Sequence, residues 1–310
     1  MSKCVFSVFF WNVRGLGQSS KCDEIKRILT ARSPTFVCLQ ELKLEQVSHF
    51  KKLSLLPPSL RSIVHLPSVG ASEGIITAWA ASDFDLLDHS LGVFSLTTRF
   101  QATASNLSLT ITNVYGPCDS PSKPEFLHEL SSIASSTSGP WAIVGDFNLI
   151  RFAEDKSNDT FNIREASLFN AFINDCGLLE IPLLDRLFTW SNNQANPTLV
   201  RLDRALVNIE WNNLLTDTSL SSFCRNESDH VPLSLRASAN IPRPVIFRLN
   251  NSWLSAPTFP PLVSANWNNV QIGHPRVPLL LHSSVSGISV SEVRPVLGQK
   301  KTKSTSRANW

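Results

Sequence analysis

Short apolar runs that end abruptly in polar residues recur along the chain. The clearest is residues 141–144, Trp-Ala-Ile-Val, which are followed by Gly145, Asp146 and, two positions later, Asn148. A short apolar run of this kind is consistent with a buried strand. In an extended segment, residues i and i+2 point to the same side. The pattern therefore predicts a central strand whose end presents a carboxylate and a carboxamide to one pocket.

Similar runs predict further strands with polar ends. Residues 5–11 and 35–39 are apolar, and residues 107–114 alternate between apolar and polar, as in a half-buried strand. The polar residues that follow such runs are Asn12, Glu41, Tyr115, Asp146 with Asn148, Asp203, and Asp229 with His230. Catalytic groups tend to collect in the loops at strand ends of a rigid sheet. We therefore expect these side chains to converge on one edge.

Apolar residues at helical spacing stand between these runs and predict helices over residues 21–32, 45–53, 125–134 and 162–176. Asn162 and Glu165 resemble a capping box at the start of the last helix, and Gly177 stands where a glycine C-cap belongs. Other strands are expected at residues 74–80, 84–91, 93–100, 188–190, 199–207 and from near 231. Few strict βαβ units occur, so the pattern favours a layered α/β or β-sandwich domain.

Composition narrows the class of protein without deciding its partner. The chain has 310 residues, of which 42% are hydrophobic and 17% charged, as in a soluble globular protein with a sizeable core. A net charge of +3 neither requires nor excludes nucleic acid. The six cysteines are scattered singly without a Cys-x-x-Cys pair, so we expect no zinc site and a reducing, intracellular compartment. We expect neither a signal peptide nor a membrane helix.

Two of the polar strand ends have the chemistry of a metal site. Glu41 offers a carboxylate and Asn12 a carbonyl oxygen, and these are the hard ligands that Mg²⁺ prefers. Magnesium commonly takes only one or two carboxylates from the protein and fills its remaining positions with water and substrate phosphate. The pair therefore predicts a Mg²⁺ site that leaves room for a phosphate.

The remaining polar residues fit hydrolysis of a phosphate ester. His230 has Asp203 or Asp229 as a carboxylate partner that orients and charges the imidazole. Asp146 can take a proton from water, whereas Asn148 and Tyr115 can donate hydrogen bonds to phosphate oxygens; both stand at strand ends. Taken singly, each of these residues is more simply a turn former or a surface residue. The set as a whole indicates metal-assisted hydrolysis.

Seven motifs stand in a characteristic order: Trp11-Asn-Val-Arg-Gly15, Leu39-Gln-Glu41, Asn113-Val-Tyr-Gly-Pro117, Gly145-Asp-Phe-Asn148, Phe188-Thr-Trp190, Arg201-Leu-Asp-Arg204 and Ser228-Asp-His-Val-Pro232. Over about residues 4–237 they resemble the endonuclease/exonuclease/phosphatase superfamily. Asp155-Lys-Ser-Asn158 and Phe188-Thr-Trp-Ser-Asn192 are similar to the endonuclease domain of LINE-type (non-LTR) retrotransposons, especially those of plants.

The resemblance implies a DNase I-like fold, a four-layered α/β sandwich of two packed, mainly antiparallel or mixed β-sheets flanked by helices. It implies Mg²⁺-dependent nicking of one strand of DNA, with Mn²⁺ as an alternative ion. For this sequence it places Glu41 as the main metal ligand, Asn12 beside it and Asp229 on the metal side. Thr189 and Arg14 are expected at the DNA-binding edge.

The same resemblance implies the catalytic roles. Asp146 would activate or orient the attacking water. Asn148 and Tyr115 would hold the scissile phosphate. His230 would contact and stabilise that phosphate, and Asp203 would orient His230.

The chain departs from the pattern in three places. Glu73 and Asp185 occupy positions where relatives often carry glycine, so we expect some loss of stability or activity there. After about residue 242, Pro, Ser and Asn increase and apolar periodicity fades. We therefore expect residues 1–240 to form the nuclease domain and residues 241–310 a poorly ordered linker or tail, without the reverse transcriptase that follows in relatives.

Three functions remain open at this point. The first is a metal-dependent DNA endonuclease, expected to be monomeric and nuclear. The second is a phosphatase or phosphodiesterase on a small phosphate ester, because the superfamily hosts both and a fold does not decide a function. The third is a decayed, inactive fragment of a retrotransposon, which the tail and the two lost glycines would favour.

Overall fold

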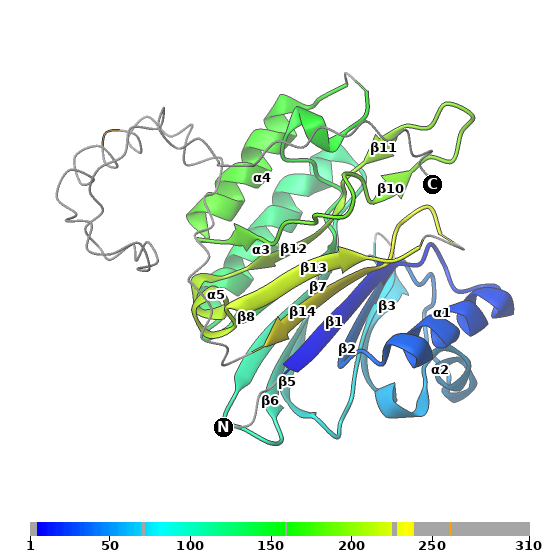
Figure 1. Ribbon diagram of the computed structural model, residues 1–310. Helices are drawn as coiled ribbons and strands as arrows, with labels where there is room; N and C mark the ends of the chain where they lie inside the picture. The colour runs from blue at the N-terminus through cyan, green and yellow to red at the C-terminus, as the bar shows by residue number, and fades with distance from the viewer. Residues whose placement is uncertain (1–4, 70–71, 159, 225–227, 239–260, 262–310) are drawn as a thin grey trace, which may run out of the picture. The chain divides into compact units, whose positions relative to one another are not determined.

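Two six-stranded sheets form the centre of the computed structural model, which describes residues 5–69, 72–158, 160–224, 228–238 and 261 (Figure 1). The first sheet has the spatial order β13 (Asp217–Ser222), β14 (Leu233–Ser238), β1 (Val5–Asn12), β2 (Phe36–Gln40), β4 (Ser72–Trp79) and β3 (Ser62–Val69). Strands β1 and β2 are parallel, and the other neighbours are antiparallel. The first sheet is therefore mixed.

The second sheet has the order β5 (Phe84–Leu91), β6 (Ser95–Ala102), β7 (Ser108–Tyr115), β8 (Trp141–Asp146), β12 (Asp203–Val207) and β9 (Leu179–Glu180). Its single parallel pair among the described strands is β7 with β8. A separate two-stranded ribbon joins β10 (Trp190–Ser191) to β11 (Leu199–Val200). Both sheets therefore combine one parallel pair with antiparallel neighbours.

Aromatic side chains fill the space between the sheets. The ring of Phe36 on β2 lies 4.8 Å from that of Phe100 on β6, and Trp79 on β4 lies 5.3 Å from Phe100. Asn113 on β7 is buried there too, and its Nδ2 donates to the carbonyl oxygen of Ile76 at 2.9 Å. Buried rings contribute large apolar areas, so this layer binds the two sheets to one another.

Helices cover the two outer faces and complete the four predicted layers (Figure 1). The helices are α1 (Ser19–Arg32), α2 (His49–Leu55), α3 (Lys123–Ser136), α4 (Ile163–Asp175) and α5 (Ile209–Leu214). Apolar residues of α1 and α2 pack on the first sheet, and those of α3 and α4 pack on the second. The α/β sandwich with two mixed sheets is confirmed.

The helix ends follow their sequence signals. Asn162 caps α4 and accepts a hydrogen bond from the backbone N–H of Glu165, and Gly177 adopts a φ of +60° just beyond the helix. The Glu165 side chain does not complete the predicted capping box, because it pairs with Lys123 and Ser120 on the neighbouring segment.

Other predictions need correction. Residues 199–207 form two strands rather than one, because the backbone N–H groups of Leu202 and Asp203 both turn to the Thr189 hydroxyl. Strands β3, β9 and β13 and helix α5 were not predicted. Glu73 does not interrupt β4, since it pairs in register with Ser68. The predicted tail lies outside the described residues, apart from residue 261.

A buried ion-pair network joins β9, β12 and the loop after β8. Glu180 pairs with Arg151 at 2.8 Å, Arg201 at 2.9 Å and Arg204 at 2.7 Å. Arg204 also pairs with Asp155, whose carboxylate accepts the backbone N–H of Arg151. The network therefore fixes the chain on both sides of the β8 and β12 ends.

Gly145 is a position where a side chain cannot fit. Its φ is +137°, and an added Cβ would lie 2.2 Å from the backbone oxygen of Val114 on β7. We expect Gly145→Ala to lower the free energy of unfolding by at least about 2 kcal/mol, through overpacking and an unfavourable backbone angle. Urea denaturation measures this loss. Gly177→Ala is the matched control, because Gly177 also has a positive φ but no atom within 4 Å of the added Cβ. An equal loss in both variants would contradict the clash.

Candidate active site

The polar ends of five strands meet at one end of the sandwich. On the first sheet, Asn12 at the end of β1 is in register with Gln40 at the end of β2. On the second, Asp146 at the end of β8 is opposite Asp203 on β12 and Tyr115 on β7. Asn12 Nδ2 donates to Asp146 Oδ2 at 2.9 Å and so links the two sheets. The predicted convergence of these residues is thus present in the structure.

His230 lies between two buried carboxylates. Its Nδ1 is 2.9 Å from Asp203 Oδ2, and its Nε2 is 3.6 Å from Asp146 Oδ2. All three residues are 2% exposed or less. The backbone oxygen of His230 accepts a hydrogen bond from the Trp11 indole, and its N–H is bonded to the Ser228 hydroxyl. Contacts of both its ring and its backbone therefore fix His230 in place.

Burial and the neighbouring charges determine the pKa values of His230 and Asp146. Burial alone would lower the pKa of His230, but the carboxylates of Asp203 and Asp146 outweigh it and raise that pKa. Burial raises the pKa of Asp146, and the charge of His230 offsets part of the effect. We infer that His230 is an imidazolium at neutral pH. Such a group can donate a hydrogen bond to a phosphate oxygen.

Asp146 is oriented by its neighbours. Its Oδ1 accepts the backbone N–H of Asn148 at 2.9 Å, and its Oδ2 accepts Nδ2 of Asn12. Asn148 adopts a φ of +48°, and its own Nδ2 donates to the backbone oxygen of Gly116 at 2.8 Å. Because both carboxylate oxygens have fixed donors, Asp146 has a single defined direction in the site.

Glu41 is the third buried carboxylate of the site. Its Oε1 lies 3.1 Å from Lys43 Nζ and 3.6 Å from Arg14 Nε, and its Oε2 is 3.5 Å from the Tyr115 hydroxyl. The hydrogen bond that Lys43 donates to Glu41 raises the pKa of Lys43. Burial, followed by the charge of Glu41, raises the pKa of Tyr115 far above neutrality. Tyr115 therefore stays a protonated donor.

Asp229 faces the same space. Its Oδ2 accepts the indole N–H of Trp190 at 2.9 Å and lies 3.4 Å from NH1 of Arg14. Arg14 thus bridges Asp229 and Glu41, and its side chain is 54% exposed. The structure places the predicted metal ligands around one spot where cationic groups already gather.

These oxygen donors fit a divalent cation. Glu41 and Asp229 offer carboxylates, and the Asn12 Oδ1 accepts only one backbone N–H, from Arg14, among the described contacts. A second group that could hold a metal is Asp146, Asp203 and His230, whose ligand atoms lie within 4.8 Å of one another. Of these two groups, the Glu41 group is the one that the sequence motifs indicate as the metal site.

Backbone strain concentrates in the site. Non-glycine residues with a positive φ include Arg14 at 53°, Glu41 at 54°, Lys43 at 55° and Asn148 at 48°. A left-handed conformation is costly for such residues and clusters at active sites and ligand clamps. These residues therefore owe their positions to the loops around them rather than to local preference.

Thr189 does not lie on a DNA-facing surface in this structure. Its side chain is fully buried, and its hydroxyl oxygen accepts the backbone N–H groups of Leu202 and Asp203 at 3.1 and 3.0 Å. The Thr189 hydroxyl thus fixes the backbone position of Asp203. Asp185, the second departure from the glycine pattern, is bonded to Ser222 through its carboxylate.

Three residues of the site were not assigned a role from sequence. Lys43 contacts Glu41, Trp190 contacts Asp229, and Ser228 donates to the backbone oxygen of Asn12 at 2.8 Å. Trp190 and Ser228 belong to two of the seven sequence motifs, so their membership in those motifs could have indicated a role in the site. Lys43 stands outside those motifs, and only its proximity to Glu41 in sequence could have indicated it.

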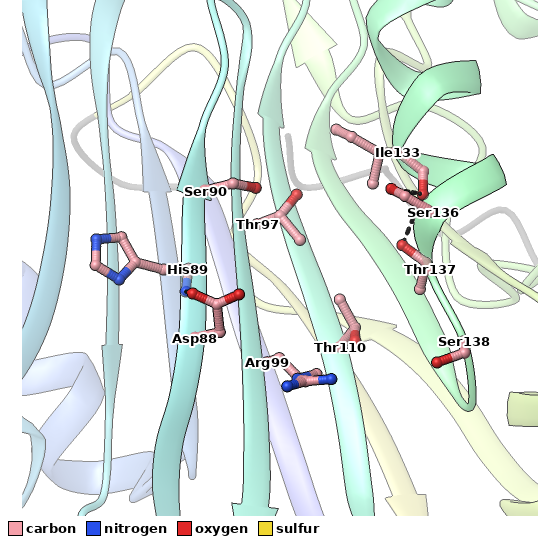
Figure 2. A pocket seen from close by; sticks show the side chains of 10 residues that line it. All are labelled: Asp88, His89, Ser90, Thr97, Arg99, Thr110, Ile133, Ser136, Thr137 and Ser138. Atoms are coloured by element: carbon pink, nitrogen blue, oxygen red, sulfur yellow. Dashed lines mark hydrogen bonds between the residues drawn. The ribbon is translucent and has the colours of Figure 1, made fainter.

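A polar hollow of about 200 Å³ lies at the other end of the second sheet (Figure 2). Its walls come from β5, β6, β7 and the end of α3, and include Arg99, Thr110 and Ser138. Thr110 is near the start of β7, whereas Tyr115 ends that strand. This hollow is therefore separate from the converging strand ends.

The sequence motifs and this geometry agree with a known family. The sequence model of the endonuclease/exonuclease/phosphatase family matches residues 9–230. The chain belongs to this family. The match runs from β1 to His230 and so includes every residue of the site described above. No curated protein matches the chain.

Solved structures of similar fold include two endonucleases and a 3′ phosphatase. The AP endonuclease LMAP from Leishmania major has a TM-score of 0.60 at 18% identity, over 77% of this chain and 88% of its own. The endonuclease domain of TRAS1, a telomere-specific non-LTR retrotransposon, has 0.56 at 14%, over 76% and 98%. The 3′ phosphatase NExo from Neisseria, bound to product DNA hairpin, has 0.55 at 18%, over 74% and 98%. At these identities the likeness establishes the fold.

No helix in the described part of the chain has the length and apolar character needed to cross a membrane.

Proposed function

We propose that this protein is a metal-dependent endonuclease that nicks one strand of DNA, with Mg²⁺ as its ion and Mn²⁺ as a substitute. The observation that carries the proposal is the juxtaposition of the His230–Asp203 pair, Asp146 and the Glu41 carboxylate at one strand-end cluster. The family match supports hydrolysis of phosphate esters. The neighbours that are named as AP endonuclease and retrotransposon endonuclease support DNA as the substrate.

The residues of the chain divide the work of hydrolysis. A divalent cation held by Glu41, Asn12 and Asp229 would supply Lewis-acid stabilisation of the phosphate charge. Asp146 takes the proton of the attacking water, since its carboxylate is buried and fixed in direction. The other residues act as donors to the phosphate oxygens as charge develops there, namely His230, Asn148 and Tyr115.

Arg14 is the residue of the site best placed to contact a DNA phosphate. Its side chain is 54% exposed, and it extends from the end of β1 between Glu41 and Asp229. A guanidinium suits bidentate contact with phosphate oxygens. We propose that it holds the DNA backbone beside the metal site.

The motifs at residues 155–158 and 188–192 favour a LINE-type retrotransposon of plants as the origin of this chain. We propose that the enzyme acts as a monomer on nuclear DNA. The TRAS1 endonuclease domain, a non-LTR retrotransposon protein of the same fold, supports this origin.

Nicking of supercoiled plasmid tests the proposed function. We expect relaxed circles with Mg²⁺, none with EDTA, and loss of nicking by about 10²-fold or more in Glu41→Ala and His230→Ala, because metal ligands and transition-state donors each contribute on that scale. Agarose gel electrophoresis measures the rate. Circular dichroism confirms that each variant is folded.

The alternatives predict other results in the same preparation. A small-substrate phosphatase would release phosphate from a nucleotide or inositol phosphate without nicking plasmid. A decayed fragment would do neither while remaining folded. Raising the salt concentration separates the endonuclease from the small-substrate phosphatase. The affinity for DNA falls steeply with salt through counterion release, whereas turnover of a small substrate changes little.

A further inference from the structure

Lys43 lies between two carboxylates of different character. Its Nζ is 3.1 Å from Oε1 of the buried Glu41 and 3.7 Å from Oε2 of Glu73, whose side chain is 40% exposed. The Lys43 side chain is itself 51% exposed. The ammonium thus touches the carboxylate that serves as metal ligand in the proposed function, and has a second anionic partner within reach on its solvent side.

The backbone holds Lys43 and Glu73 together. The N–H of Lys43 donates to the carbonyl oxygen of Glu73 at 2.8 Å, and the N–H of Leu42 donates to that of Gly74 at 3.1 Å. The stem of Lys43 runs beside Gly15, where an added Cβ would lie at ordinary contact distance, 3.5 Å from Lys43 Cδ. The two side chains are therefore neighbours because of fixed backbone pairing, while their charged ends remain free to rotate.

A divalent cation at Glu41 must compete with the ammonium of Lys43. Both are cations that use the same carboxylate, and they repel one another at short range. Displacing the ammonium is costly if it then has no partner. Glu73 removes much of this cost, because the ammonium can keep a carboxylate contact on the side away from the site.

We propose that Glu73 is a positioning residue that receives the Lys43 ammonium when a divalent cation binds at Glu41. This inference rests on the proposed function, since it assumes that Glu41 is a metal ligand. Glu73 acts through Lys43 and does not touch the metal or the substrate.

Isothermal titration calorimetry of the full chain with Mg²⁺ and with Mn²⁺ tests the inference without relying on activity. We expect Glu73→Gln to raise the Kd of the metal by about two- to five-fold, the range of a partly exposed ion pair. Glu73→Asp should restore part of the affinity. Lys43→Met should lower the Kd, because it removes the competing cation and keeps the apolar stem over Gly15. Glu45→Gln, which removes an exposed carboxylate two positions after Lys43, should leave the Kd unchanged.

A double-mutant cycle separates this mechanism from a general effect of negative charge. If Glu73 acts through Lys43, the Glu73→Gln change has no effect on Kd in the Lys43→Met background. If Glu73→Gln raises the Kd of the metal equally in both backgrounds, Glu73 acts on the metal through its electrostatic field and not through Lys43. That result would overturn the inference. An unchanged Kd in Glu73→Gln would overturn it as well.

Glu41→Gln distinguishes failure of the inference from failure of the proposed function. If the wild type binds metal and Glu41→Gln does not, the metal site stands and the Glu73 variants decide the inference alone. If Glu41→Gln binds metal as well as the wild type, the proposed metal site is wrong, and the role of Glu73 falls with it. Thermal unfolding of each variant confirms that it is folded before titration.

Discussion

Replacing Asp146 by asparagine is expected to lower the rate of plasmid nicking by about 10²- to 10⁴-fold, the usual contribution of a positioned general base. Asparagine has nearly the same shape, and its single oxygen can still accept the backbone N–H of Asn148 in place of Oδ1. Its amide group cannot accept Nδ2 of Asn12 as Oδ2 does, nor can it take the proton of the attacking water. The change therefore removes the base and one hydrogen bond while it keeps the size of the side chain.

The measurement is an initial rate of nicking at saturating Mg²⁺, which removes any effect on metal affinity. Asp175→Asn is the matched control, because Asp175 is an exposed aspartate at the end of α4. That variant should nick at the wild-type rate. A rate for Asp146→Asn within about ten-fold of the wild type would exclude Asp146 as the general base, whose removal costs about 10²-fold or more.

Glu180→Gln is expected to give the largest loss of stability. Glu180 is the shared partner of Arg151, Arg201 and Arg204, so the substitution takes one carboxylate from three guanidinium groups. Removing one partner of a buried ion pair costs about 3–5 kcal/mol, because charges remain in the interior without compensation. Urea denaturation at neutral pH measures the change in unfolding free energy. Glu154→Gln, an exposed neighbour of Asp155, should have an effect below about 0.5 kcal/mol.

The same substitution has a defined pH dependence. Burial alone would raise the pKa of Glu180, but Arg204, Arg201 and Arg151 lower it to about 2 from an ordinary value of 4.5. The carboxylate therefore contributes its full stability above pH 4.5 and loses it as the pH falls towards 2. The difference between wild type and Glu180→Gln should be constant near neutrality and shrink within that window. A difference that stays constant down to pH 3 would contradict the lowered pKa.

The sequence predicted the residues of the site better than the elements around it. Asn12, Glu41, Asp146 and His230 each stand at a sharp change from apolar to polar residues, and a strand end is where such a change has a structural meaning. Their meeting depended on two sheets packing at one end, which periodicity cannot show. The resemblance of the motifs to the family predicted that these residues share one site.

The elements missed from sequence share a physical cause. Strand β13 reads Asp-Thr-Ser-Leu-Ser-Ser, which is polar because it is the edge of its sheet, and its pairing with β14 rather than its composition makes it a strand. Strand β9 has only two residues. Thr189 was expected near DNA because it lies in a family motif, whereas its burial follows from the turn of the chain between β11 and β12.

The contacts of Lys43 illustrate a different limit. A left-handed φ at Glu41 and at Lys43 is unfavourable for both residue types, so no local preference predicts it. It arises because the segment after β2 is hydrogen-bonded on one side to residues 13–16 and on the other to Glu73 and Gly74. Tertiary pairing therefore determines which way these two charged side chains point.

The antiparallel pairing of β1 with β14 has a consequence for synthesis of the chain. Residue Val5 pairs with Ser238, so the first strand to leave the ribosome waits for almost the last described residue before one of its edges is covered. Contacts of such long sequence separation slow folding, and an uncovered strand edge is a site of aggregation meanwhile. The late segment that covers this edge also carries His230. A nascent chain stopped before that segment has an open sheet and lacks the His230 imidazole, so the complete site and protection from aggregation arrive together, late in translation of the described domain.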